Sequence, residues 1–321
     1  MHVTLVAPPG GGPGGAEEGT PHMRLGLTMI ATDRAMPAHL LAREAEDRGF
    51  ASLYLPEHTH IPVARTTPSP AGPGAGATWQ ASYLKGASGD ETLAEDYARM
   101  VDPFIALAAA AAVTSRIILG TGVCLPAQRE PIVTAKAVAT LDQLSGGRFV
   151  LGIGYGWNVE EAADHGVSWS RRREVVRENV QAMRSLWTRE QASFKGEFVS
   201  FEASWAWPKP VGSVPVLLGG APGPKLFASI AEYGDGWLPI GGAGIRAALP
   251  RLAQAYETAG RDPLTATVIP FGTLPTVQKL EYYASLGIEE VVLRLPAGGR
   301  DEVLPVLDEY VATYLGQAGV G

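Results

Sequence analysis

The stretch that most constrains the fold is residues 116–158, in which two short apolar runs flank a helical pattern. The runs Ile117–Leu119 and Phe149–Ile153 each end in a glycine-rich turn, and Pro131 between them stands at the place of a first helical residue. The apolar residues that follow Pro131 at helical spacing are Ile132, Val133, Val138, Leu141 and Leu144. Continuous apolar strands joined by an amphipathic helix are what a parallel sheet buried on both faces requires, so we predict an α/β fold.

The rest of the chain reads as further copies of this strand–helix unit. We predict strands over 24–30, 51–55, 117–119, 149–153, 214–218, 236–240, 267–271 and 290–295. A helical pattern follows each strand, within 37–48, 102–113, 131–144, 169–187, 225–233, 245–259, 276–286 and 303–315. Eight such units predict a (β/α)8 TIM barrel. A doubly wound sheet is the competing fold, but the glycine-rich turns after three strands favour a ring of ligand-facing loops.

Two segments interrupt this regularity. Residues 1–22, rich in glycine and proline, are a predicted disordered tail, and residues 23–321 form the predicted barrel domain. After the second strand, an extended loop insertion over 61–100 contains Trp79. Loops of this length inside a compact domain are usually functional lids or disordered inserts. We expect this loop to close over a substrate and assign Trp79 to the substrate pocket; the alternative for Trp79 is a packing residue that covers the barrel.

Composition narrows the function classes. The formal net charge of −7 argues against nucleic acid and acidic membrane surfaces as partners. No apolar run approaches the ~20 residues of a membrane-spanning helix. The lone cysteine, Cys124, excludes an internal disulfide and a multi-cysteine metal site. These features predict a cytoplasmic protein with a small-molecule substrate.

Longer segments of the chain carry a family resemblance. They read GFASLYLPEHTHIP, REPIVTAKAVATLDQLSGGRFVLGIGYGWNVEEAADHG and PVLLGGAPGPKLFASIAEYGDGWLP. Together they resemble the bacterial luciferase-like monooxygenase superfamily, and most closely its F420-dependent oxidoreductases. The resemblance implies a TIM-like barrel, a flavin or deazaflavin cofactor at the C-terminal face of the barrel, and a homodimer.

Glu57 and His58 follow the second predicted strand. Histidine is the side chain best suited to proton transfer near neutral pH. The resemblance implies that both residues lie beside the cofactor ring, so we take them as catalytic; the alternative for His58 is a loop-capping hydrogen bond. His58 and His60 also suggest a divalent metal site, but His165 is the only later histidine. Too few ligands remain, and we predict no metal.

The resemblance places the cofactor ring against two strand ends. After the third strand, Gly122 and Val123 match a backbone bulge that often contains a non-proline cis peptide bond. After the fourth, Tyr155, Gly156 and Asn158 match cofactor-binding positions. Glycine in such a turn lets backbone amides approach a ligand without a Cβ clash.

Trp157 departs from one branch of the family. The family's sugar-phosphate dehydrogenases place a proton-donating glutamate at this position. An aromatic residue there suggests a flat or apolar substrate, and we assign Trp157 to the substrate pocket. Arg294, which ends the eighth predicted strand, points either into that pocket or to a salt bridge.

The fifth predicted strand ends in a further glycine turn. Leu218, Gly219, Gly220 and Ala221 precede a helix whose second residue is Lys225. Free amides at a helix N-terminus attract an anion, so we assign this turn to the phosphate tail of the cofactor; the alternative is a tight turn without a ligand. The basic run 171–173 could reach the acidic tail of a deazaflavin, but we favour a solvated helix face.

These observations predict an oxidoreductase that transfers a hydride between coenzyme F420 and an organic small-molecule substrate. One alternative is an FMN-dependent monooxygenase of the same fold that uses molecular oxygen. A second alternative is a non-catalytic flavin-binding protein.

Overall fold

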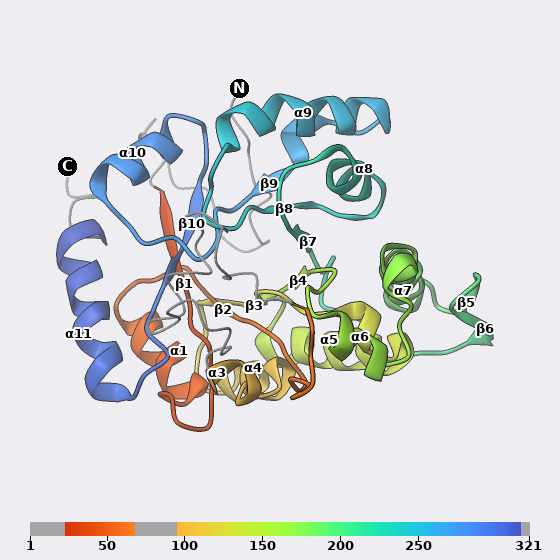
Figure 1. Ribbon diagram of the computed structural model, residues 1–321, viewed down its shortest axis with the longest axis horizontal. Helices are drawn as coiled ribbons and strands as arrows, with labels where there is room; N and C mark the ends of the chain where they lie inside the picture. The colour runs from red at the N-terminus through yellow and green to blue at the C-terminus, as the bar shows by residue number, and fades with distance from the viewer. Residues whose placement is uncertain (1–22, 68–94, 316–321) are drawn as a thin grey trace.

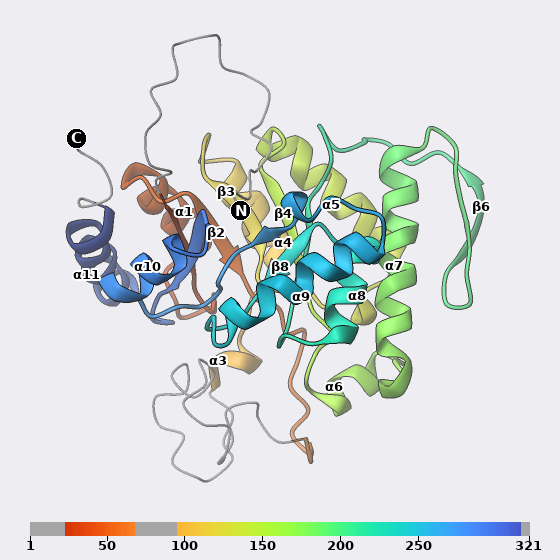
Figure 2. The ribbon, with the colours of Figure 1, turned by 90° about the horizontal axis from the view of Figure 1, so that it is seen from above.

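The computed structural model describes residues 23–67 and 95–315, and its centre is an eight-stranded parallel sheet (Figures 1 and 2). The strand order is β10-β1-β2-β3-β4-β7-β8-β9. The strands are β1 (Arg24–Thr28), β2 (Ser52–Leu55), β3 (Ile118–Thr121), β4 (Phe149–Ile153), β7 (Val216–Gly219), β8 (Gly236–Leu238), β9 (Thr267–Val268) and β10 (Glu290–Arg294). Thr273, beyond β9, donates to Val292 and accepts from Arg294 through its backbone, both at 3.0 Å. These bonds bring the two sheet edges together into a nearly closed barrel.

A helix follows every strand of the barrel. The helices are α1 (Ala38–Asp47), α4 (Pro103–Ala111), α5 (Pro131–Ser145), α7 (Arg172–Thr188), α8 (Pro224–Tyr233), α9 (Ile245–Thr258), α10 (Val277–Ala284) and α11 (Arg300–Tyr310). They surround the strands in Figure 1, which confirms the predicted (β/α)8 barrel.

Several shorter elements lie outside the eight strand–helix units. They are α3 (Glu95–Ala98), α6 (Val159–Asp164), the hairpin β5 (Ala192–Lys195) and β6 (Ser200–Ser204), the 3₁₀ turns Pro126–Gln128, Trp169–Arg171 and Pro263–Thr265, and a π-helical turn Val311–Leu315. The hairpin lies at the periphery beside α7 in both ribbon views. Two predicted helices therefore change geometry at one end: 169–187 begins as 3₁₀ and 303–315 ends as π-helix.

Capping residues and a glycine define where the helices begin and end. Asp102 caps α4 by accepting a hydrogen bond from the backbone N of Ile105 at 3.0 Å. Glu130 caps α5 in the same way, and its carboxylate accepts from Val133 N at 2.6 Å. Gly146 ends α5 in the left-handed region at φ 67°, where a residue with a Cβ is disfavoured. The helix after β3 thus begins and ends where its sequence predicts.

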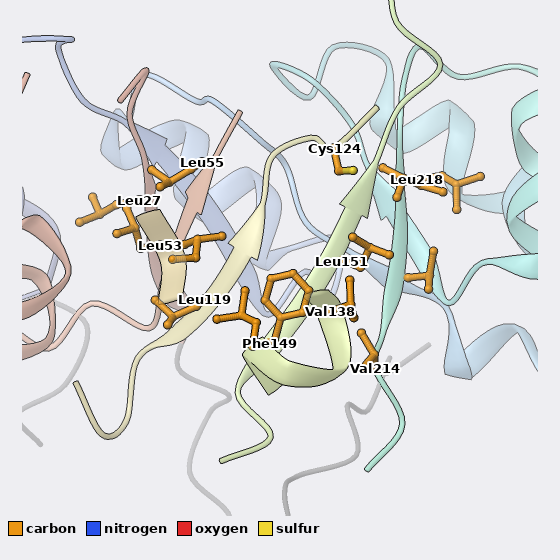
Figure 3. Packing of buried hydrophobic residues seen from close by; sticks show 14 of the residues in the cluster. Leu27, Leu53, Leu55, Leu119, Cys124, Val138, Phe149, Leu151, Val214 and Leu218 are labelled. Atoms are coloured by element: carbon orange, nitrogen blue, oxygen red, sulfur yellow. The ribbon is translucent and has the colours of Figure 1, made fainter. Parts of the chain in front are cut away.

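The apolar residues form two layers separated by the sheet. Leu53, Leu119 and Leu218 point outward against the helices (Figure 3). The inner layer fills the barrel with Tyr54, Leu217, Leu238, Ile269, Phe271 and Val292. Since neighbouring residues in a strand face opposite sides, Leu217 and Leu218 belong to different layers. The barrel interior is therefore a packed core that supports whatever lies above it.

The apolar residues of α5 do not all face the core. Of its five apolar residues at helical spacing, only Val138 and Leu141 are buried. The three that face solvent are Ile132, Val133 and Leu144, at 43%, 68% and 59% exposure. The buried face of α5 also contains Thr134, Ala135 and Ala139, so small residues as well as large apolar ones pack against the neighbouring elements.

The barrel is packed so closely that one added methyl group should lower its stability. A Cβ at Gly152 in β4 would lie 2.0 Å from the carbonyl oxygen of Thr121, and a backbone atom in a sheet cannot rotate away. We expect Gly152→Ala to lower the free energy of unfolding by about 1–3 kcal/mol, the cost typical of overpacking. Urea unfolding would measure this. Gly212→Ala, where a Cβ would meet nothing within 4 Å, is the control and should change stability little.

Candidate active site

A cavity of about 330 Å³ opens at the C-terminal ends of the strands. Its walls come from residues at or beyond the ends of β1, β2, β3, β4, β7, β8 and β9, together with α3 and the start of α7. Parallel strands bring all their C-terminal ends to one rim, so segments far apart in the chain meet there. The predicted glycine turns after β3, β4 and β7 share this single cavity.

His58 enters the cavity from the end of β2, and both of its ring nitrogens have partners. Nδ1 lies 2.8 Å from Oε2 of Glu161, and Nε2 accepts a hydrogen bond from the indole Nε1 of Trp157 at 3.1 Å. An indole nitrogen only donates, so Nε2 carries no proton in this arrangement and Nδ1 carries it instead. His58 is therefore poised as a neutral imidazole.

Glu57 lies next to His58 but faces other partners. One carboxylate oxygen accepts from the backbone N of Leu125 at 2.7 Å, and the other accepts from Nε of Arg129 at 2.5 Å. Arg129 also bonds Asp102, the cap of α4, at 2.6 Å. Burial opposes the charge on Arg129, yet its bonds to Glu57 raise the pKa of the guanidinium. Glu57 touches the cavity and at the same time anchors the chain that leaves β3.

The strand ends meet around Val123. The peptide bond between Gly122 and Val123 is cis, which confirms the expectation for this bulge. A Cβ at Gly154 would lie 2.7 Å from Cγ2 of Val123, and one at Gly219 would lie 3.0 Å from its Cγ1. Glycine is therefore required at both positions by close approach. The resulting wall of the cavity consists largely of backbone.

Tyr155 lies beyond β4 and lines the cavity near two basic residues. Its hydroxyl is 2.7 Å from the hydroxyl of Tyr233, and the guanidinium carbon of Arg173 lies 4.0 Å from the centre of its ring. Burial raises the pKa of Tyr233, which keeps this phenol neutral. The contacts fix the Tyr155 ring between α7 and α8.

The basic run 171–173 divides between two environments. Arg171 bonds Glu197 at the surface, as expected for a solvated helix face. Arg172 and Arg173 instead line the cavity, so the interpretation as a solvated face is wrong for them. Burial and then the neighbouring Arg173 lower the pKa of Arg172. Among the described residues, Nε of Arg172 and Nη1 of Arg173 are buried and have no hydrogen-bond partner.

The turn after β7 borders the same cavity as Arg172 and Arg173. Gly219, Gly220 and Ala221 line the cavity, and α8 starts just beyond them without a side-chain cap. The amides at that helix end remain available to an anion. Lys225 is exposed and lies outside the cavity lining.

Comparison with known proteins agrees with this architecture. Residues 23–278 match the luciferase-like monooxygenase family. The chain belongs to this family. An uncharacterized protein of Mycobacterium tuberculosis is 42% identical over 293 residues, which cover 90% of this chain and 98% of that one.

Family members with known cofactors are more distant. An F420-dependent glucose-6-phosphate dehydrogenase of Kineococcus radiotolerans is 38% identical over 160 residues, 47% of each chain. The structure of an F420-dependent secondary alcohol dehydrogenase in complex with an F420–acetone adduct superposes with a TM-score of 0.70 at 18% identity, covering 91% of this chain and 98% of that one. At 18% identity, the superposition shows that the two proteins share a fold.

Three further predicted site residues, Asn158, Leu218 and Arg294, lie outside the cavity lining. Asn158 is buried, and its Oδ1 caps α6 by accepting from Glu161 N at 3.2 Å. Leu218 points into the layer between the sheet and the helices (Figure 3). Neither Asn158 nor Leu218 lines the cavity. Arg294 is also outside the lining, although its carbonyl accepts from the hydroxyl of Tyr310. Trp79 lies outside the described residues.

Several cavity residues carried no usable signal in the sequence. Ile30, Tyr97, Met100 and Phe271 form apolar wall, and Tyr97 and Met100 come from the end of the predicted lid. Burial raises the pKa of Tyr97 to about 12, so its phenol stays neutral. Glu161 was missed because an acidic residue in the first turn of a helix is usually a surface feature.

Two further findings apply to residues 23–67 and 95–315. None of the helices there has both the length and the apolar composition that a membrane span requires. No group of three or more histidine, cysteine, aspartate or glutamate side chains is arranged to hold a metal ion.

Arg129 offers a test of the ion pair behind the cavity. Arg129→Met would leave the Glu57 carboxylate, 4% exposed, without its cation. Breaking a buried pair on one side costs about 3–5 kcal/mol, so we expect a loss of that size in urea unfolding. Arg99→Met removes a surface ion pair with Asp33 and should lower stability much less than Arg129→Met does. Equal losses in the two variants would contradict this account.

Proposed function

We propose that this protein is an oxidoreductase that transfers a hydride between coenzyme F420 and an organic small-molecule substrate. The observation that carries the proposal is that His58 and the glycine-containing turns after β3, β4 and β7 border one cavity. The family membership and the F420-dependent relatives support the choice of cofactor. The single, fully buried cysteine suits our further proposal of a cytoplasmic location.

The residues present fit such a cofactor. The backbone wall at Gly122–Val123, together with Tyr155 and Gly156, would hold the flat ring. Gly220, Ala221 and the start of α8 would hold the phosphate, and the unpartnered donors of Arg172 and Arg173 would bind the acidic tail. When bound, the deazaflavin would supply the carbon that accepts or gives the hydride.

The substrate would lie against the apolar side of the cavity. Ile30 and Tyr97 pack together there with Met100 and Trp157. These side chains offer aromatic and aliphatic surface with few polar groups, which suits a flat or apolar substrate and excludes water from the reacting centre. His58 would exchange the proton that accompanies the hydride.

Cofactor titration tests the proposal. We expect F420 to bind tightly and FMN weakly, followed by fluorescence of the purified protein. Arg173→Met should raise the dissociation constant for F420 roughly tenfold or more, since a hydrogen bond to a charged group is worth about 1.5–3 kcal/mol. Arg171→Met removes the neighbouring guanidinium that bonds Glu197 and should leave the affinity unchanged.

The alternatives predict other results. Tight binding of FMN without binding of F420 would reject our choice and favour a flavin monooxygenase that uses molecular oxygen. Cofactor binding without turnover on a broad substrate panel would favour a non-catalytic flavin-binding protein.

We also propose that the protein is a homodimer, formed through the outer faces of α4 and α5. Ile105 in the first turn of α4 is 74% exposed, and Ile132 and Val133 in the first turn of α5 are 43% and 68% exposed. The two helices lie side by side in Figure 1 and contact each other. A group of large exposed apolar residues is a common mark of a protein interface.

Charge in this group should separate the subunits. We expect Ile105→Glu combined with Val133→Glu to convert a dimer into a monomer, because each carboxylate would be buried without a partner. Size-exclusion chromatography with light scattering measures the mass. Leu264→Glu changes an exposed apolar residue beside α9 and should leave the dimer intact. A wild-type protein that runs as a monomer at micromolar concentration would reject the dimer.

A further inference from the structure

The contact between His58 and Glu161 is buried. The side chain of Glu161 is fully buried and that of His58 is 7% exposed, with 2.8 Å between Oε2 and Nδ1. The other oxygen, Oε1, has no partner among the described residues. A buried carboxylate with so few bonds is costly unless its charge is used. The pair therefore calls for an explanation beyond packing.

The two sides of the imidazole face different surroundings. Nδ1 meets Glu161, which does not line the cavity, whereas Nε2 meets Trp157, which does. The carboxylate only accepts and the indole only donates, so they select the same tautomer from opposite sides. The unprotonated nitrogen is therefore the one on the cavity side.

The helix that carries Glu161 is held in place independently of the pair. Further along α6, Asp164 bonds His60 at 3.0 Å, and at its start Glu160 bonds the backbone N of Thr66 at 2.6 Å. Beyond its end, Nε2 of His165 lies 2.7 Å from the hydroxyl of Thr59. These contacts tie α6 to the segment that follows β2. The carboxylate is thus presented to His58 by a supported element.

We propose that Glu161 is a positioning residue that keeps the Nε2 lone pair of His58 directed into the cavity, with the Trp157 N–H as its temporary partner. The inference rests on the proposed hydride transfer. In the oxidising direction, Nε2 would take the proton that the substrate releases together with its hydride, and the resulting imidazolium would lie next to the Glu161 carboxylate. In the reducing direction, Nε2 would return that proton to the substrate. The indole must turn away from Nε2 when the substrate occupies its place.

Nitrogen NMR of ¹⁵N-histidine-labelled protein tests the inference without cofactor or substrate. His58→Gln identifies the His58 signals by their loss. We expect wild-type His58 to show a protonated Nδ1 and a non-protonated Nε2. In Glu161→Gln, the amide can donate as well as accept, so we expect loss of this single-tautomer pattern. A purely structural role for Glu161 would leave the pattern unchanged, and that result would overturn the inference.

Two variants serve as matched comparisons. Asp164→Asn breaks the exposed carboxylate–histidine pair on the same helix and should leave the His58 signals unchanged. Trp157→Phe removes only the donor to Nε2 and should shift the Nε2 signal while Nδ1 stays protonated. Should Glu161→Gln fail to fold, the wild-type spectrum still decides, because a proton on Nε2 of wild-type His58 would overturn the inference.

The outcome is separable from that of the proposed function. Glu161→Gln should bind F420 within about twofold of the wild-type affinity, because Glu161 lies outside the cavity lining. Failure of the wild-type protein to bind F420 would reject the proposed function and leave the tautomer result standing. Normal F420 binding with a freely exchanging His58 tautomer would reject the inference alone.

Discussion

The close approach of β3, β4 and β7 around Val123 is the constraint on which the site depends. Two glycines, Gly154 and Gly219, leave room for the two methyl groups of one valine, and their own backbone becomes the cavity wall. Glycine at these two positions lets the three strand ends approach each other closely at the cavity.

Around this wall, the functional side chains come from segments that the barrel brings together. His58 leaves β2, and its partner Glu161 begins α6 after β4. Arg172 and Arg173 begin α7 and meet the turn after β7 at the cavity. The imidazole and the two guanidinium groups thus border one cavity although they come from different strand–helix units.

Much of the fold could be predicted because each strand and helix is specified by residues that lie close together in the sequence. Phe149–Ile153 is a strand with the predicted bounds, and Pro131 begins the helix as its ring geometry dictates. The catalytic roles of Glu57 and His58, carried by the resemblance, remain predictions. Ile132 and Val133 show the limit: their apolar character and spacing predict a helix but do not tell which residues face solvent.

By itself, the sequence determined the strand–helix order, the glycine turns and the place of His58 after β2, because periodicity and turn chemistry act between near neighbours. Only the tertiary structure decided that Glu161, 103 residues further along, reaches His58, and that Arg173 enters the cavity while Arg171 faces solvent. The physical reason is that the barrel brings the C-terminal ends of separate strands to one rim, whereas sequence patterns report only on near neighbours. Arg171 ends the 3₁₀ turn before α7 and Arg173 lies in the first turn of α7, so similar neighbours in sequence meet different surroundings.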